Sequence, residues 1–203
     1  GKKLVYVRTL VWESDWTFKE GQVYQRTYDP ATQTFGPEQV VVADGTNNYY
    51  PSWSPDGNWI MFTRSSSGLA YDNNFATIWA VKADGSLPPI QLTAANQDFG
   101  LTDSWARWAP FQQTLGSPEE PVFWITMSSK RDFGVRLRNT GLPQRGATGR
   151  RAQLWMAPFF PGRAAQGLDP TLPAFRLPFQ NLESSNHITQ WTERVLPAPP
   201  VIE

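Results

Sequence analysis

The stretch from Tyr49 to Arg64, YYPSWSPDGNWIMFTR, restricts the folds open to this chain more than any other. Two apolar runs with period-two alternation flank the turn Pro55-Asp56-Gly57-Asn58. Proline fixes φ at the first corner of such a turn, and glycine adopts a positive φ without steric cost. Trp53 precedes the turn, and the strand-forming run from Trp59 to Phe62 follows it. The stretch therefore predicts a β-hairpin rich in aromatic side chains.

Parts of this hairpin recur along the chain in a fixed order, at intervals of roughly 55 to 75 residues. The Ser52–Pro55 segment matches Arg107–Pro110. Three further strand types also recur, at 4–8, 59–64 and 122–126, at 23–28, 78–81 and 154–157, and at 39–42, 90–92 and 175–177. Four antiparallel strands per repeat without an intervening helix are typical of propeller blades. A β-sandwich also has many short strands, but it does not explain the recurring order.

The predicted fold class is therefore all-β, with about three four-stranded antiparallel propeller blades. Their expected bounds are 1–43, 48–93 and 103–180, followed by an extra strand at 184–195 and a Pro-rich tail at 197–203. The first blade lacks its innermost strand, which we expect before Gly1. Since propellers close with four or more blades, we expect a larger propeller or one completed by a partner.

The composition supports short strands and excludes several classes of function. Eighteen prolines and fifteen glycines in 203 residues argue against long helices. A formal net charge of zero argues against a globally basic nucleic-acid binder, and the absence of cysteine excludes disulfides and thiolate metal sites. No run has the length of a transmembrane helix, and no signal peptide is recognisable.

The hairpin motif also carries a family resemblance. Trp53, Pro55, Asp56 and Gly57, followed by an apolar strand, resemble the WD40-like (PD40) repeat of TolB-type β-propellers, whose core reads W-S-P-D-G-x-x-I-x-F. The next copy keeps Trp108 and Pro110, but it replaces Asp-Gly with Phe111 and a longer loop to Pro121. The resemblance implies a module that binds proteins rather than catalyses a reaction. It also implies an extracytoplasmic, periplasmic location in a bacterial envelope.

Blade topology predicts that the long loops gather on one face. These loops are 9–22, 65–77 and 128–153, with the connections 43–48 and 93–103 beside them. Enlarged loops on one side of a rigid scaffold commonly carry binding. Aromatic residues among polar ones make a good contact surface, although they can also fold back onto the blades. The candidate contact residues are Trp12, Trp16, Phe18, Tyr71 and Phe75.

The third loop is rich in arginine and contains the single acid Asp132 between Lys130 and Arg151. Arginine forks bind carboxylates and phosphates, so the loop predicts an acidic protein surface or another anionic ligand as its partner. The alternative is that these arginines pair with acids of the chain itself, such as Asp98, Asp103, Glu119 and Glu120. The candidate arginines are Arg131, Arg136, Arg138, Arg145, Arg150 and Arg151.

Catalytic, metal and cofactor motifs are sparse. His187 is the single histidine, and no G-x-S-x-G, G-x-G-x-x-G or P-loop motif occurs. No cofactor or metal is therefore expected, although Asp72, Asn73 and Asn74 leave calcium open. Carboxylates such as Asp15, Asp72 and Asp103 could converge in space, which sequence cannot show.

The sequence favours a non-enzymatic protein-interaction module that binds through loops on one face. A specific form of this hypothesis is an accessory subunit of a larger envelope or membrane-associated complex. The alternative is a propeller enzyme that binds or hydrolyses a glycan or peptide with its loop carboxylates. A third interpretation is a ligand-binding sensor that uses the arginine-rich loop.

Overall fold

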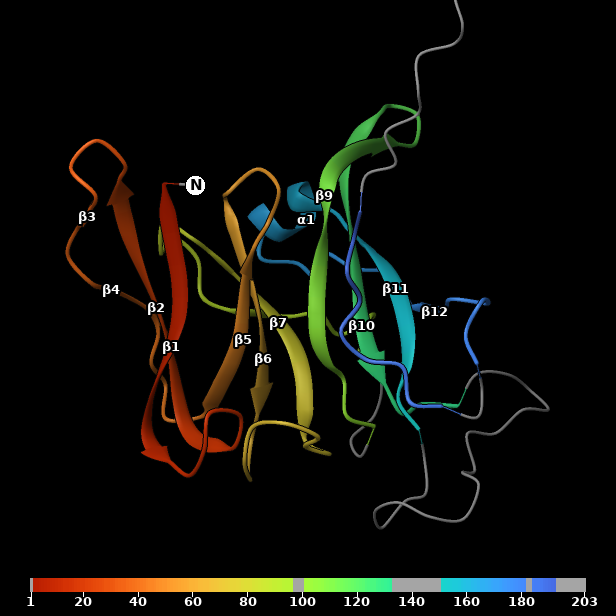
Figure 1. Ribbon diagram of the computed structural model, residues 1–203. Helices are drawn as coiled ribbons and strands as arrows, with labels where there is room; N and C mark the ends of the chain where they lie inside the picture. The colour runs from red at the N-terminus through yellow and green to blue at the C-terminus, as the bar shows by residue number, and fades with distance from the viewer. Residues whose placement is uncertain (1, 97–100, 133–150, 182–183, 193–203) are drawn as a thin grey trace, which may run out of the picture.

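The chain forms three four-stranded antiparallel β-sheets that stand side by side (Figure 1). The computed structural model describes residues 2–96, 101–132, 151–181 and 184–192. Sheet 1 contains β1 (Lys3–Trp12), β2 (Phe18–Asp29), β3 (Thr34–Phe35) and β4 (Gln39–Val42). Sheet 2 contains β5 (Asn47–Trp53), β6 (Trp59–Ser65), β7 (Ala76–Lys82) and β8 (Ile90–Gln91). Sheet 3 contains β9 (Ser104–Leu115), β10 (Glu120–Ser129), β11 (Gln153–Phe159) and β12 (Phe175–Arg176). The predicted all-β class with blade-like sheets is confirmed.

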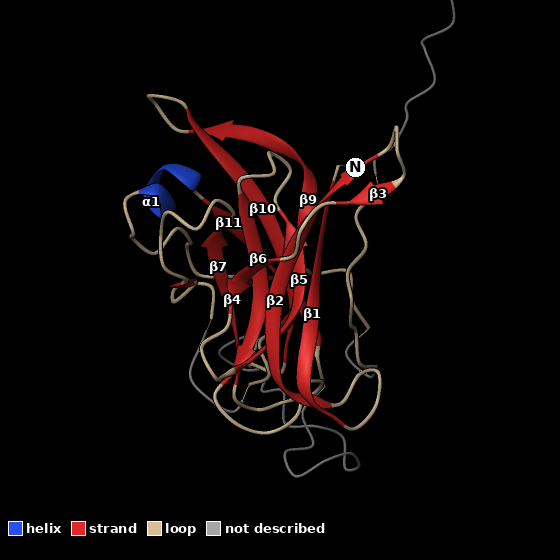
Figure 2. Cartoon of the chain, turned by 90° about the vertical axis from the view of Figure 1, so that its left-hand side faces the viewer, coloured by secondary structure: helices blue, strands red, loops and turns tan. Residues whose placement is uncertain are grey.

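Sheets 2 and 3 are simple meanders, in which each strand pairs with the next along the chain. Sheet 1 differs, because β3 and β4 both pair with β2 and β1 forms the opposite edge. The sheets pack face to face in chain order, with sheet 2 in the middle (Figure 1). Figure 2 views the stack from the side of sheet 1. This arrangement leaves the outward faces of sheets 1 and 3 at the two sides of the molecule.

Sheet 2 is buried on both faces, and its period-two alternation divides its side chains between two cores. Ile60 and Phe62 of β6 pack toward sheet 1, whereas Trp59 and Met61 pack toward sheet 3. All four side chains are buried. The core shared with sheet 1 also contains Val23, Val42, Val81 and Ala83, and the core shared with sheet 3 also contains Ile78, Trp108, Phe123, Ile125 and Phe159.

The predicted turn at 55–58 is built from local hydrogen bonds. Gly57 has φ +70°, the conformation for which glycine is needed. The Ser54 hydroxyl donates to Asp56 and accepts from the Trp59 amide at 2.9 Å, and Asp56 also accepts from the Asn58 amide at 3.1 Å. The Ser-Pro-Asp-Gly motif therefore forms the turn of the β5–β6 hairpin and has a structural role.

The motif tryptophans pack between the sheets. Trp53 packs against the core shared by sheets 1 and 2. Trp108 is buried in the core shared by sheets 2 and 3, and its Nε1 donates to the Ser52 carbonyl at 3.2 Å. Pro110 lies in β9.

Three expectations about loops and strands are wrong. The 9–22 segment is no long loop, because β1 and β2 stay paired as far as Trp12 and Phe18. The expected loop from Phe111 to Pro121 is mostly strand, because β9 continues to Leu115 opposite Glu120. Residues 184–192 of the expected extra strand form no strand, and residues 193–195 lie outside the described residues.

The last described segment lies against sheet 3. The Asn186 amide donates to the Ala152 carbonyl at 2.8 Å, and Trp191 Nε1 donates to the Thr126 hydroxyl at 3.2 Å. A short helix, α1 (Pro161–Ala165), follows β11. The Pro-rich tail at 197–203 lies outside the described residues. No helix in the described part of the chain is long and apolar enough to cross a membrane.

Candidate protein-interaction surface

The connections between strands gather at the two ends of the sheets, as blade topology requires (Figure 1). We call one end the loop end. It contains the turn at 13–17, the loop at 66–75, and the segments 101–103 and 130–132. The opposite end, which we call the hairpin end, carries the β2–β3, β5–β6 and β9–β10 turns. The β1–β2 and β6–β7 connections therefore lie at the same end of the sheets, as expected, although the first is a short turn.

Backbone hydrogen bonds join the loop-end segments of neighbouring sheets. The Ala70 amide donates to the Phe18 carbonyl at 2.8 Å, linking sheet 2 to sheet 1. The Asp103 amide donates to the Ala76 carbonyl at 3.2 Å, linking sheet 3 to sheet 2. The side chain of Asn47 adds a bond to the Phe18 carbonyl at 2.9 Å. The loop end is thus one connected layer rather than a set of separate loops.

The most exposed aromatic residues of the loop end lie at the tip of the β1–β2 hairpin. Trp12 and Trp16 are each 65% exposed, and Leu10 beside them is 62% exposed. The turn itself is ordered, since the Glu13 and Ser14 amides both donate to the Thr17 carbonyl. A tight turn therefore keeps two tryptophan side chains exposed to solvent. Burying the apolar area of each side chain would be favourable.

Two further aromatic residues come from the β6–β7 loop. Tyr71 and Phe75 are about half exposed. The buried Asn73 fixes this loop, because its amide donates to the Ser67 and Leu69 carbonyls at 2.7 and 2.6 Å. Its side-chain oxygen accepts from the Phe75 amide at 2.8 Å. Four of the five predicted contact aromatics thus lie exposed at the loop end, on segments with defined backbone conformations.

Phe18, the fifth predicted contact aromatic, is a correction. It is only 8% exposed and packs edge-on against Tyr49, with 6.3 Å between the ring centroids. It opens β2 on the inner face of the sheet, so the expectation that it contacts a partner is wrong. Phe18 instead folds back onto the blades, which was the alternative interpretation of these aromatic residues.

Arg131 is the second correction, because its side chain is buried rather than presented to an anionic partner. Its Nη2 donates to Asp103 Oδ1 at 2.8 Å and to the Ala95 carbonyl at 2.9 Å. Its guanidinium also lies over the Trp155 ring, 4.9 Å from the centroid. The sequence alternative, pairing with Asp103, is confirmed for this arginine.

The remaining arginines of the predicted anion site are not brought together by the described structure. Arg136, Arg138, Arg145 and Arg150 lie outside the described residues. Arg151 is half-buried at the start of the segment that leads into β11. An anionic partner for this loop therefore stays a prediction.

Two of the loop-end carboxylates, Asp72 and Asp103, pair with cations rather than with each other. Asp72 Oδ1 lies 2.5 Å from Lys130 Nζ, and Asp103 pairs with Arg131 in the interior. Partial desolvation lowers the pKa of His187, although the nearby charge of Asp72 opposes that shift. Among the described residues, no three His, Cys, Asp or Glu side chains gather closely enough to hold a metal ion.

A third ion pair, Arg64–Asp44, joins sheet 2 to the connection that precedes β5. Burial raises the pKa of the Asp44 carboxyl, but hydrogen bonds from Thr46 and Asn48 and the charge of Arg64 lower it more. The net pKa of Asp44 is therefore below its ordinary value. Burial lowers the pKa of Arg64, and Asp44 opposes this.

An aromatic stack that no sequence pattern predicted lies under the loop end. Tyr50 of β5 and Trp105 of β9 stack with 3.8 Å between centroids, and Tyr71 packs edge-on against Trp105. Tyr50 and Trp105 have φ values of +53° and +56°, a region that disfavours aromatic residues. Burial raises the pKa of Tyr50. Backbone strain of this kind depends on tertiary contacts and has no sequence signature.

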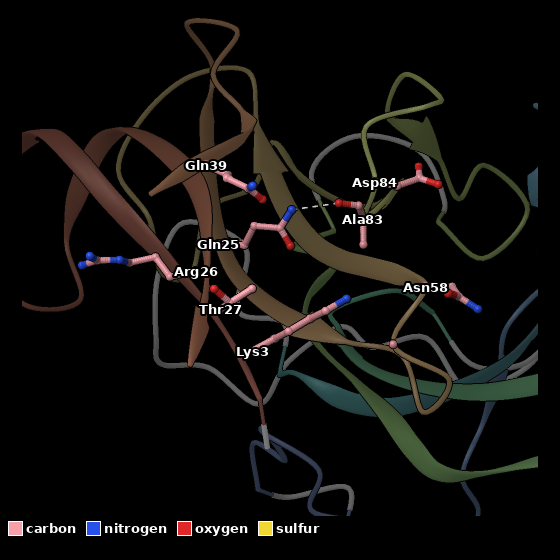
Figure 3. A pocket seen from close by; sticks show the side chains of 9 residues that line it. Lys3, Gln25, Arg26, Thr27, Gln39, Asn58, Ala83 and Asp84 are labelled. Atoms are coloured by element: carbon pink, nitrogen blue, oxygen red, sulfur yellow. Dashed lines mark hydrogen bonds between the residues drawn. The ribbon is translucent and has the colours of Figure 1, made fainter. Parts of the chain in front are cut away.

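The hairpin end holds a polar pocket of about 230 Å³ between sheets 1 and 2 (Figure 3). Gln25 reaches across it and donates to the Ala83 carbonyl at 2.8 Å. It is smaller and more polar than a typical small-molecule site. Its lining residues are Lys3, Gln25, Arg26, Thr27, Gln39, Gly57, Asn58, Ala83 and Asp84.

Comparisons with protein-family models, with curated proteins and with solved structures found no match to this chain. What the loop end can bind follows from its own side chains. Exposed tryptophan, tyrosine and phenylalanine residues on fixed backbone suit contact with a protein surface.

Proposed function

We propose that this chain is a non-enzymatic interaction module of TolB-like propeller type, which binds a protein partner through its loop end. The observation that carries the proposal is the pair Trp12 and Trp16, each 65% exposed at the tip of an ordered hairpin. Tyr71 and Phe75 extend the same surface onto sheet 2. The alternative, hydrolysis by loop carboxylates, has less support, because Asp72 and Asp103 pair with Lys130 and Arg131 and not with each other.

Exposed tryptophans favour binding to a partner because burying large aromatic side chains at an interface is energetically favourable. Tryptophan is among the residues enriched at the energetic centres of protein interfaces. The hydrogen-bonded turn at 13–17 also presents both tryptophans without a large ordering cost on binding. Exposed apolar patches rimmed by polar residues are typical of such binding sites.

The proposal includes an accessory role in a larger complex of a bacterial envelope, on its periplasmic side. It rests on the resemblance of the Trp53–Gly57 motif to TolB-type repeats. Fold-level resemblance is a weaker basis than the exposed surface, so the two parts need separate tests.

The test compares the partners that the full chain retains from an envelope fraction after cross-linking. The baits are the wild type, the double variant W12A/W16A, and the control F179A, which removes an aromatic side chain that is 78% exposed elsewhere. We expect a partner retained by the wild type and F179A and lost by W12A/W16A. Equal retention by all three folded baits, or retention of nothing, would overturn the proposal. Recovery from the cytoplasmic fraction alone would contradict the periplasmic location.

A further inference from the structure

In each sheet of the molecule, one arginine contacts both an aromatic ring and a carboxylate. Its guanidinium lies over the ring, between 4.2 and 5.2 Å from the ring centroid. An ion pair joins the same guanidinium to the acid. Attraction to the ring and pairing with the carboxylate therefore act on one cation. The three groups are Arg8 with Tyr24 and Glu38, Arg64 with Trp79 and Asp44, and Arg131 with Trp155 and Asp103.

The tip of the β1–β2 hairpin has rings and carboxylates of the same kind, but it has no such cation. Glu13 follows Trp12, and Asp15 precedes Trp16; both acids are exposed. No lysine or arginine of the described residues lies over either ring or forms an ion pair with either acid. The segment 9–20 contains three acids and one lysine, so the tip is negatively charged in a chain whose formal net charge is zero.

Hydrogen bonds hold the backbone of this tip in one conformation. The Thr17 amide donates to the Ser14 hydroxyl at 3.2 Å, in addition to the two amides that donate to the Thr17 carbonyl. Below the turn, the Thr9 hydroxyl donates to the Lys19 carbonyl at 2.8 Å. Both tryptophans and both acids thus lie within residues 12–16 on an ordered turn, and binding a cation there requires little ordering of the backbone.

A guanidinium suits the tip better than an ammonium group does. Tryptophan gives the strongest cation–π attraction of the aromatic side chains, and a guanidinium can lie flat on its ring. The same guanidinium can donate two parallel hydrogen bonds to a carboxylate. The ammonium of lysine is compact and strongly hydrated, so it stacks less well on a ring. A single exposed ion pair contributes little by itself, which makes the rings necessary for binding.

We propose that the hairpin tip, residues 12–16, binds an arginine-rich segment of the protein partner. A guanidinium of that segment stacks on Trp12 or Trp16 and pairs with Glu13 or Asp15. The negative charge of the tip selects a positively charged partner surface. The tip belongs to the proposed loop-end surface, so this proposal rests on the proposed function and names the chemistry of the partner.

The probe is a fluorescein-labelled peptide, GRGRGRGR, titrated with the full chain and followed by fluorescence anisotropy. The wild type should bind it saturably, and the lysine peptide GKGKGKGK should bind at least about threefold more weakly. E13Q/D15N keeps both rings and should weaken binding of the arginine peptide by about tenfold, as should W12A/W16A, which keeps both acids. The matched control E119Q/E120Q removes two exposed carboxylates from the β9–β10 hairpin and should bind like the wild type.

Three results would overturn the proposal: no saturable binding, equal affinity for the two peptides, or equal weakening by E119Q/E120Q. The envelope capture separates this failure from failure of the proposed function. A partner lost by W12A/W16A but retained by E13Q/D15N would leave the proposed function intact and overturn the arginine site alone. Phosphatidylcholine vesicles that bind the wild type but not W12A/W16A would assign the rings to a membrane surface and also overturn it. All variants should keep the urea midpoint of the wild type, because the changed side chains are exposed.

Discussion

Replacing Arg131 by methionine should destabilise the protein far more than the same change at Arg64 or Arg8. All three arginines stack on an aromatic ring and pair with an acid, so they differ mainly in burial. The change R131M removes the cation and leaves the carboxylate of Asp103 in the interior, where it is 2% exposed. Breaking a buried ion pair from one side costs about 3–5 kcal/mol.

The comparison with the other two sites gives a graded expectation. Arg64 is 13% exposed and its partner Asp44 is 38% exposed, so solvent screening reduces the cost of R64M to about 1–2 kcal/mol. Arg8 lies at the surface, and R8M should have the smallest effect of the three. For a chain of this size, about 4 kcal/mol corresponds to a fall of about 8–16 °C in Tm.

Urea unfolding followed by tryptophan fluorescence measures these differences. The double variant R131M/D103L should recover most of the loss, because it removes both charges of the buried pair. A loss below about 1 kcal/mol for R131M would refute the reasoning. A double variant whose loss equals the sum of the two single losses would also refute it, since the charges would then not be coupled.

Three further predictions concern separate features. F18A should cost about 3 kcal/mol in urea unfolding because Phe18 is buried, whereas W12A should change stability by less than about 0.5 kcal/mol. Equal effects would contradict the placement of these rings. G21A should cost about 1–3 kcal/mol, since a Cβ there would lie 2.4 Å from the Asn48 carbonyl oxygen; an unchanged Tm would contradict this. The lowered pKa of Asp44 adds stability above about pH 4 that is lost as the pH falls through that pKa. D44N should therefore flatten the loss of stability in acid-range urea titrations, and a slope like the wild type would contradict this.

The sequence by itself determined the features that depend on neighbouring residues. The Pro-Asp-Gly turn forms where predicted because proline, aspartate and glycine each favour it locally. The strand types and their recurring order were also predictable, because period-two alternation and turn residues recur with them. Blade topology also predicted that Trp12 and Trp16 lie at the loop end, although it left their exposure open.

Only the tertiary structure decided which candidate side chains are free to bind. Arg131 and Arg151 belong to the same basic segment, yet Arg131 is buried by Asp103 and Ala95, which lie 28 and 36 residues away. Phe18 turns inward because its ring meets Tyr49 of the next sheet. In each case contacts between residues distant in the chain set burial and pairing, and local propensity does not encode them.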